Sequence, residues 1–284
     1  MVRAVAGASL EVRAGEVVGL VGESGCGKST LARAVVGLNR AASGSISFEG
    51  TPVTPLGLRR RTMTGVQMVF QDPYASLNPR RRVGDQIADG LRVAGDATSS
   101  PADLLERVGL PREFASRHPH EFSGGQRQRI AIARALAARP RLLIGDEPIS
   151  ALDASAQSQV ATLMRDLAVS SGAGLLFISH DLSVVRLIAD RIAVMYLGRI
   201  VEVGDTAEVW AEPRHPYTQA LLGGRSRSRT GWGVLLAELP GDVPDPADPP
   251  QGCRFHPRCP LVMDVCRVKE PEFGPVACWL HEPS

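Results

Sequence analysis

A glycine-rich segment near the start of the chain has the residue types and spacing of a phosphate-binding loop. Residues 22–30 read GESGCGKST and match the pattern G-x-x-x-x-G-K-[ST], between an apolar run at 16–21 and a helical pattern at 28–38. Glycines let backbone N–H groups converge on phosphates, and the helix N-terminus that follows favours negative charge. We expect Lys28 to reach the β- and γ-phosphates and Ser29 to ligate Mg²⁺. An incidental glycine-rich turn is the alternative, but the strand before and the helix after favour nucleotide binding.

All nine residues of this loop are candidates for nucleotide contact. They are Gly22, Glu23, Ser24, Gly25, Cys26, Gly27, Lys28, Ser29 and Thr30. Lys28 is also a catalytic candidate, because it reaches the γ-phosphate. Cys26 stands at a position that the pattern leaves open, and we interpret it as a small side chain that the loop tolerates.

Two acidic residues follow a second apolar run, at 142–145. Asp146 and Glu147 would lie at the carboxyl end of a buried strand, the edge at which α/β sheets bind ligands. We expect Asp146 to hold Mg²⁺ through its water shell and Glu147 to polarise the attacking water as general base. A plain strand-to-turn transition has the same appearance, so the pair is a weak signal alone. Downstream of a phosphate loop it favours nucleotide hydrolysis.

The elements that must position these residues alternate between apolar runs and helical patterns. This order predicts an α/β fold with a parallel sheet flanked by helices. Strands are expected at 16–21, 66–70, 142–145, 174–178, 192–196 and 200–203. Helices are expected at 28–38, 83–93, 101–108, 125–138, 154–169, 182–189 and 217–222. We divide the chain into a nucleotide-binding domain at 1–222, a proline-rich linker at 223–250 and a cysteine-rich segment at 251–284.

Composition excludes several classes of protein. The formal net charge of the 284 residues is +2, which gives no reason to expect a nucleic-acid partner. No run of 18 apolar residues is long enough to span a membrane, and residues 1–20 lack the layout of a secretory signal. We therefore expect a cytoplasmic protein.

A segment at 122–129 identifies a family. It reads FSGGQRQR and resembles the signature of ABC ATPases, whose usual form begins with leucine where this chain has Phe122. Serine and glycine N–H groups that open a helix form an anion site. A simple capping turn is the alternative, and it leaves Gln126 and the basic run unexplained. The resemblance covers nearly the whole chain and implies a P-loop NTPase core with a helical signature subdomain at about 72–137.

The resemblance also assigns roles to residues whose own signal is weak. Gln71 looks like the glutamine that touches Mg²⁺ and water, and His180 resembles the histidine that contacts the γ-phosphate. Asp153 ends a segment that resembles the loop crossing to the partner subunit. In the family two such domains pack head to tail, with each ATP between one phosphate loop and the opposite signature. The residues expected to serve the partner's nucleotide are Ser123, Gly124, Gly125 and Gln126.

Three longer matches narrow the subfamily. Residues 71–80, 214–218 and 252–260 closely resemble importers of oligopeptides, dipeptides and nickel. Soluble DNA-repair members of the ABC family carry long coiled coils between the phosphate loop and the signature, and translation-type members carry two such domains in tandem. Neither arrangement fits this chain. The resemblance implies an ATPase that works with a second ATPase subunit, identical or sibling, with transmembrane permease subunits and indirectly with a solute-binding protein. Such a translocase subunit lies at the cytoplasmic face of the membrane. Peptide is the expected solute, and nickel and opines stay open.

One departure concerns the base of the nucleotide. Family members carry an aromatic residue on an early strand that stacks on adenine, but no aromatic residue precedes Gly22. Either the start of the chain is incomplete or misassigned, or another group holds the base. Arg3 and Arg13 are candidates for stacking.

Four of the five cysteines crowd the end of the chain. Cys253, Cys259, Cys266 and Cys278 are separated by five, six and eleven residues, which fits neither a zinc ribbon nor the common ferredoxin patterns. Four converging thiolates suit a 4Fe–4S cluster or tetrahedral Zn²⁺, and free thiols or disulfides stay open. Resemblance to dipeptide-importer subunits favours the iron–sulfur cluster. We expect it to staple a segment too small for its own core, separated by the linker from the phosphate loop and without a part in hydrolysis.

Overall fold

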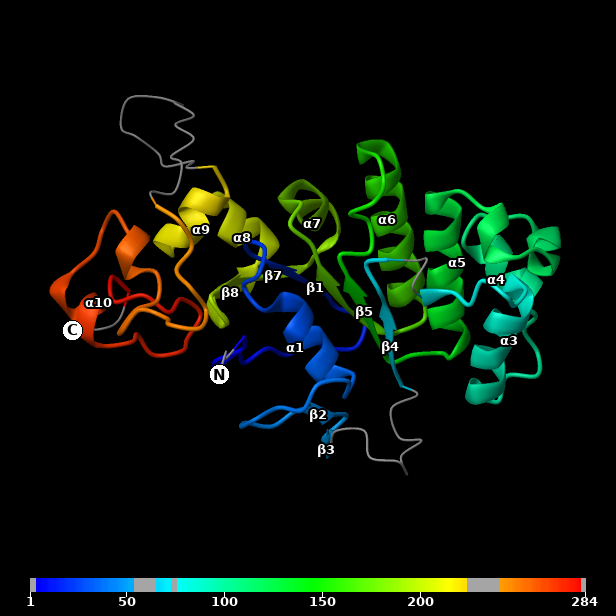
Figure 1. The fold of residues 1–284 in the computed structure, drawn as a ribbon, viewed down its shortest axis with the longest axis horizontal. Coiled ribbons are helices and arrows are strands. Elements are labelled where there is room, and N and C mark those ends of the chain that lie inside the picture. The colour runs from blue at the N-terminus through cyan, green and yellow to red at the C-terminus, as the bar shows by residue number, and fades with distance from the viewer. Residues whose placement is uncertain (1–3, 54–64, 73–75, 224–240, 282–284) are drawn as a thin grey trace. The chain divides into compact units, whose positions relative to one another are not determined.

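The computed structural model describes residues 4–53, 65–72, 76–223 and 241–281. These residues form two compact units, and we describe each by itself (Figure 1). The loop unit consists of the described residues of Met1–Glu11, Gly19–Leu31 and Asp190–Ser284. The signature unit consists of those of Val12–Val18 and Ala32–Ala189.

The signature unit contains strands in the order β4-β5-β6-β1, of which β4, β5 and β6 are parallel. Its strands are β4 (Val66–Val69), β5 (Leu142–Asp146), β6 (Gly174–Ile178) and the first two residues of β1 (Val17–Val21). Nearly every residue of these strands is buried, which is why they are almost continuously apolar rather than alternating. In the register of β5 and β6, Asp146 pairs with Ile178, so both strands end at the same level.

Three helices of the signature unit, α3 (Val83–Ala94), α4 (Pro101–Arg107) and α5 (Gly124–Ala137), pack against one another (Figure 1). A reciprocal capping box of Ser100 and Asp103 begins α4. The remaining elements of this unit are the hairpin of β2 (Ser47–Phe48) and β3 (Thr51–Pro52), α6 (Ala154–Ser170), α7 (Leu182–Ile188), and the 3-10 turns η1 (Arg112–Ser116) and η2 (Pro119–Glu121).

The loop unit contains strands in the order β1-β7-β8, with β7 (Arg191–Tyr196) and β8 (Arg199–Asp205) antiparallel. Helix α1 (Lys28–Val35) begins in this unit. Its other elements are α8 (Thr206–Ala211), α9 (Pro216–Leu221), the 3-10 turn η3 (His256–Arg258) and α10 (Asp264–Val268). Backbone bonds from Val203 to Pro275 and from Ala277 to Val201, both 2.8 Å, attach the cysteine-rich segment to β8.

The α/β fold and all seven predicted helices are confirmed, with small shifts at their ends. The sheet is mixed rather than wholly parallel, because β7 and β8 run antiparallel. Helix α1 ends before the predicted residue 38, since Gly37 adopts a positive φ of 77°. The β2–β3 hairpin and α8 were not predicted. In the part of the chain that the structure describes, none of the helices has the length and hydropathy to cross a membrane.

Candidate functional site

The glycines of the phosphate loop are required by its backbone. Gly22 and Gly27 have φ of 151° and 107°, and a Cβ atom would lie 2.1 Å from the Met195 carbonyl oxygen at Gly22 and 2.2 Å from that of Ala4 at Gly27. Either contact is shorter than real Cβ atoms make, so no other residue fits. Gly25 also has a positive φ, of 80°, but faces open space. The loop therefore leaves a cradle that has no side chain at the two tightest positions.

Lys28 is folded over this loop. Its ammonium donates to the carbonyl oxygens of Gly22 at 2.8 Å and Glu23 at 3.1 Å, and only 4% of the residue is exposed. The Cys26 thiol is 3.8 Å from the same ammonium, and burial raises its pKa. A buried thiol with a raised pKa is unreactive, which agrees with the interpretation of Cys26 as a packing residue.

The end of β5 carries the two predicted acids. Asp146 is buried, and Glu147 follows with a φ of 48°, the left-handed conformation that non-glycine residues seldom adopt. The Glu147 N–H donates to the Ile178 carbonyl at 3.0 Å, and the N–H and hydroxyl of Ser150 donate to the Glu147 carbonyl. These bonds hold a strained backbone in place, as is common where a side chain must be aimed at a ligand.

Two of the predicted catalytic side chains converge on Glu147. Its Oε2 atom is 3.4 Å from Nε2 of Gln71 and 3.4 Å from Nδ1 of His180. The Glu147 side chain is 17% exposed, and that of His180 is 56% exposed. The three groups come from the ends of β4, β5 and β6, so adjacent strands bring Gln71 and Glu147 together although they lie 76 positions apart in the chain. The arrangement can hold and orient a water molecule beside a carboxylate base.

The segment at 122–129 opens α5 with a reciprocal capping box. The Ser123 N–H donates to Oε1 of Gln126 at 3.0 Å, and the Gln126 N–H donates to the Ser123 hydroxyl at 3.3 Å. Arg127 is buried and donates to the Pro119 carbonyl at 2.7 Å, while Arg129 donates to the Val108 carbonyl. Local structure therefore does explain Gln126 and part of the basic run, contrary to the expectation from sequence.

Features beyond the capping box still distinguish this helix start. Ser123 and Gly124 are exposed, and a Cβ atom at Gly124 would meet nothing within 4 Å. Phe122, which replaces the usual leucine, is buried against the ring of Phe114 with centroids 5.1 Å apart. The substitution thus fills a core position and leaves the exposed part of the segment unchanged.

Asp153 and Arg13, two further residues for which the sequence predicts a contact, form local hydrogen bonds in this structure. Asp153 is the N-cap of α6 and accepts from the Ala156 N–H at 2.9 Å. Arg13 is exposed, and its backbone N–H donates to Glu16 at 2.8 Å. Arg3 and residues 224–240 of the expected linker lie outside the described residues.

The four terminal cysteines line one small cavity in the loop unit, of about 10 Å³. All four are free thiols. Burial, together with a smaller effect of the nearby thiols of Cys266, Cys278 and Cys259, raises the pKa of Cys253 to about 11. Across residues 4–53, 65–72, 76–223 and 241–281, no group of three or more His, Cys, Asp or Glu side chains has an arrangement that could hold a metal ion.

The expectation that the linker separates the cysteine-rich segment from the phosphate loop is wrong. Both guanidinium NH groups of Arg258 bind the Glu23 carboxylate, at 2.8 and 3.2 Å. The Tyr217 hydroxyl accepts from the Glu23 N–H at 2.9 Å. Sequence reasoning missed both partners, because neither lies within a motif whose residues point to the loop.

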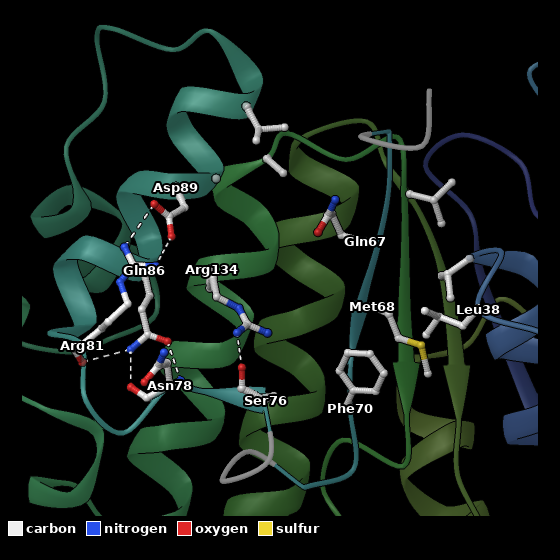
Figure 2. A pocket seen from close by; sticks show the side chains of 15 residues that line it. Leu38, Gln67, Met68, Phe70, Ser76, Asn78, Arg81, Gln86, Asp89 and Arg134 are labelled. Carbon is white, nitrogen blue, oxygen red and sulfur yellow. Dashed lines mark hydrogen bonds and ion pairs between the residues drawn. The ribbon is translucent and has the colours of Figure 1, made fainter. Parts of the chain in front are cut away.

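A cavity with a volume of about 500 Å³ lies in the signature unit (Figure 2). We call it the groove; β4, α3, α5 and the residues after α1 line it. Leu38, Met68 and Phe70 supply apolar surface, and the Arg134 guanidinium reaches the Ser76 carbonyl at its border. Burial lowers the pKa of Arg134.

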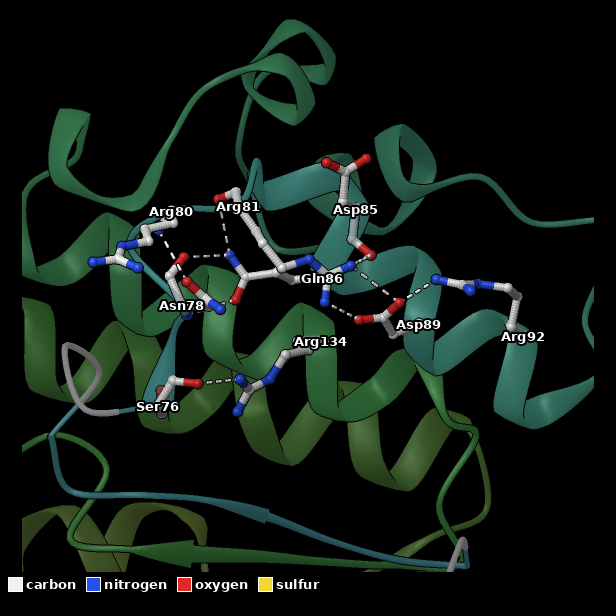
Figure 3. A network of polar contacts seen from close by, with 9 residues as sticks. All are labelled: Ser76, Asn78, Arg80, Arg81, Asp85, Gln86, Asp89, Arg92 and Arg134. Carbon is white, nitrogen blue, oxygen red and sulfur yellow. Dashed lines mark hydrogen bonds and ion pairs between the residues drawn. The ribbon is translucent and has the colours of Figure 1, made fainter.

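A polar network stiffens one wall of the groove (Figure 3). The Gln86 amide donates to the carbonyls of Asn78 at 3.0 Å and Arg81 at 3.1 Å, and accepts from the Asn78 N–H at 2.8 Å. Arg81 pairs with Asp89, and this hydrogen bond lowers the pKa of the Asp89 carboxyl. Asn78 and Arg81 are thereby fixed to α3.

Comparison with known proteins assigns the chain to a family. Residues 5–150 match the family model described as ABC transporter. The chain belongs to the ABC transporter family. Residues 201–266 match a second model, described as oligopeptide/dipeptide transporter, C-terminal region.

Full-length relatives of this ABC protein carry consistent descriptions. The oligopeptide transport ATP-binding protein AppF of Bacillus subtilis is 47% identical over 99% of this chain and 90% of its own length. A protein of Sinorhizobium fredii described as "Probable peptide ABC transporter ATP-binding protein" is 47% identical over all of this chain and 84% of its own.

Solved ABC structures support the fold. CbiO1 of Clostridium perfringens, part of the transporter complex cbiONQ, matches with a TM-score of 0.63 and 30% identity, over 74% of this chain and 84% of its own. The ATP-binding cassette MJ0796, in a dimeric post-hydrolysis state with ADP and phosphate, matches with a TM-score of 0.62 and 25% identity, over 72% and 90%. The P-loop ABC ATPase fold is therefore established for this chain.

Proposed function

We propose that the chain is the ATP-binding and ATP-hydrolysing subunit of an ABC importer of peptides. The observation that carries the enzymatic part is the convergence of Gln71 and His180 on the Glu147 carboxylate at the carboxyl ends of the strands. The descriptions of full-length relatives and the match of residues 201–266 support peptide as the solute. Uptake of a labelled oligopeptide by proteoliposomes that contain the whole transporter tests it. ATP-dependent uptake of the peptide supports the proposal, and uptake of nickel instead of peptide contradicts the assignment of peptide as the solute.

The phosphate loop binds the ATP phosphates. Glycine at the two positions where a Cβ atom would collide lets the loop adopt positive φ angles, a conformation in which loop N–H groups can converge on an anion. Lys28 turns from the carbonyls of Gly22 and Glu23 toward the β- and γ-phosphates. Ser29, Gln71 and Asp146 would hold Mg²⁺, an ion that prefers oxygen ligands. When bound, Mg²⁺ neutralises charge on the phosphates and so lowers the barrier to transfer.

Glu147 is the general base. Its carboxylate accepts a proton from the attacking water, and the Gln71 amide orients the same water molecule. His180 keeps the carboxylate in place through Nδ1 and contacts the γ-phosphate through its exposed ring. The left-handed backbone of Glu147 holds the side chain in this direction.

A second ATPase subunit, identical or sibling, completes each site. Ser123, Gly124, Gly125 and Gln126 bind the γ-phosphate held by the partner's loop, and Asp153 lies at the crossing contact. The exposed start of α5, a helix of 14 residues, supports this role, because its N–H groups and dipole attract an anion. Residues of about 72–137 form the helical subdomain that carries this signature.

The groove receives a segment of a permease subunit, through which the chain is held at the cytoplasmic face of the membrane. Its volume of about 500 Å³ and its mixed lining, with apolar side chains facing a polar wall, suit part of an amphipathic helix. Phe70, which precedes Gln71 in the chain, lines it, so its occupant acts next to the residue that faces Glu147. This position gives a physical route from the membrane partner to hydrolysis. A solute-binding protein acts through the permease and does not touch this chain.

In the cysteine-rich extension at 251–284, the residues that would hold a 4Fe–4S cluster are Cys253, Cys259, Cys266 and Cys278, although the described side chains as they stand form no metal-binding group. The lining of one cavity by all four thiols supports this. The cavity has room for about one water molecule, which is less than the cluster occupies. When bound, the cluster stabilises thiolates that burial otherwise disfavours.

Metal analysis of anaerobically purified protein tests this assignment. We expect brown protein with about four irons per chain and absorbance near ~400 nm. Cys266→Ser loses the iron, whereas Cys26→Ser, at the cysteine outside the cavity, keeps it. Colourless protein with about one zinc per chain contradicts the cluster and leaves a zinc staple; protein without metal contradicts both.

A further inference from the structure

Glu23, inside the phosphate loop, is held by the cysteine-rich segment. The Arg258 guanidinium donates to both carboxylate oxygens, NH1 to Oε2 at 2.8 Å and NH2 to Oε1 at 3.2 Å. The Arg258 side chain is 6% exposed and that of Glu23 is 27% exposed. This bidentate pair therefore lies largely out of water, where a charged hydrogen bond is strong and an unpaired charge is costly.

The backbone of Glu23 is fixed as well. Its N–H donates to the buried Tyr217 hydroxyl at 2.9 Å, and its carbonyl accepts from Lys28 at 3.1 Å. The Tyr217 ring packs against Tyr196 and Phe255, with centroid distances of 4.7 and 5.5 Å. Phe255 is only three residues before Arg258, so one short stretch of the cysteine-rich segment supplies both the aromatic packing and the arginine.

The chemistry of the loop gives this contact a purpose. A carboxylate within a loop that binds polyphosphate repels the ligand. It can also turn toward the loop N–H groups and occupy the site that the phosphate would take. The planar guanidinium fork neutralises the carboxylate and fixes its direction. Because Lys28 bonds to the carbonyl of the same residue, movement of Glu23 also disturbs the lysine that meets the phosphates.

We propose that Arg258 is a positioning residue for the phosphate loop, and that its ion pair with Glu23 makes ATP affinity depend on the cysteine-rich segment. This inference rests on the proposed role of residues 22–30 in binding ATP. It assigns the segment a part in nucleotide binding, where the sequence predicts a purely structural or assembly role.

A double-mutant cycle tests the proposal on the full-length protein. The variants are Arg258→Ala, Glu23→Gln and the combination, with Arg267→Ala as a matched control that removes an exposed arginine from the same segment. The dissociation constant of MgADP is measured by titration calorimetry, which does not depend on hydrolysis. KM and kcat for ATP, the melting temperature and the metal content are measured for each variant.

We expect Arg258→Ala to weaken MgADP binding and raise KM about tenfold, with kcat within about twofold, and Arg258→Lys to lie in between. In the Glu23→Gln background the same substitution should change affinity less than about twofold, because the partner charge is gone. Arg267→Ala should resemble the parent protein.

Equal losses of affinity in both backgrounds overturn the proposal, because they mean that Arg258 acts only by keeping the segment folded. Unchanged affinity in Arg258→Ala overturns it too. Lys28→Ala distinguishes failure of the underlying function: if it binds MgADP normally, residues 22–30 do not bind the phosphates, and the loop assignment fails rather than the Arg258 contact alone.

Discussion

Nδ1 of His180 lies 3.4 Å from Oε2 of Glu147. The contact follows from the register of β5 and β6, in which Asp146 and Ile178 are partners and the next residues leave the sheet together. A histidine two residues after one strand thereby meets a glutamate one residue after its neighbour. This contact turns an isolated histidine, a weak signal in the sequence, into part of a site.

Replacing His180 should therefore slow hydrolysis without preventing nucleotide binding. We expect His180→Ala to lower kcat about 100-fold, because the carboxylate loses an orienting partner and the γ-phosphate a contact. The dissociation constant of MgADP should stay within about threefold, since the phosphate loop is unaltered. His120→Ala, at an exposed histidine of the same unit, is the control. A His180→Ala protein with normal kcat contradicts the role of the contact.

The exposed start of α5 should be needed for ATP turnover but not for nucleotide binding by the chain's own phosphate loop. Ser123→Arg places a bulky side chain where the partner's nucleotide is expected, so ATPase activity should fall more than about 100-fold. MgADP binding by the isolated subunit should be unchanged. Ser116→Arg, at another exposed serine of the signature unit, controls for the added charge. Loss of MgADP binding by the isolated Ser123→Arg subunit would show that the signature serves its own loop.

Base recognition should be weak. Without an aromatic residue ahead of Gly22, most affinity comes from the phosphates and Mg²⁺. GTP should compete with ATP at similar concentrations in an equilibrium binding assay. A preference for ATP above about 100-fold, some ~2.7 kcal/mol, would mean that another group reads adenine.

The two kinds of glycine in the loop should respond differently to alanine. In Gly22→Ala the new Cβ atom would lie 2.1 Å from the Met195 carbonyl oxygen, at a position with a positive φ. We expect the free energy of unfolding to fall by about 2–4 kcal/mol and ATP binding to be lost. Gly25→Ala meets no atom and should lose only about 1 kcal/mol. Chemical denaturation of the two variants measures the difference. Equal losses would show that φ alone, and not the carbonyl contact, sets the requirement at Gly22.

Much of the fold could be predicted because its signals are local. The apolar runs at β4, β5 and β6 and the capping residues Ser100 and Ser123 specify their elements within a few positions. The β2–β3 hairpin escaped prediction because its strands are two residues long and mostly exposed. The sequence also gave no sign that β7 and β8 run antiparallel, since both read as short buried strands.

The candidate site was predictable only where a motif carries it. Lys28 and Glu147 stand in recognisable patterns, but the left-handed backbone of Glu147 depends on a bond to Ile178 of β6 as well as on the local turn to Ser150. Arg258 and Glu23 are 235 residues apart, and nothing in the sequence around Arg258 indicates which carboxylate it pairs with. Contacts of this kind arise from tertiary packing, which the composition and spacing of a segment do not encode.

The central claim is that this chain hydrolyses ATP with Glu147 as general base, and single-turnover hydrolysis by Glu147→Gln tests it most directly. The amide keeps the size of the side chain but cannot accept the proton of water, so we expect hydrolysis to fall more than about 1000-fold while MgATP still binds and holds the closed dimer. Lys28→Ala, in contrast, should lose MgATP binding itself. Near-normal hydrolysis by Glu147→Gln would contradict the account.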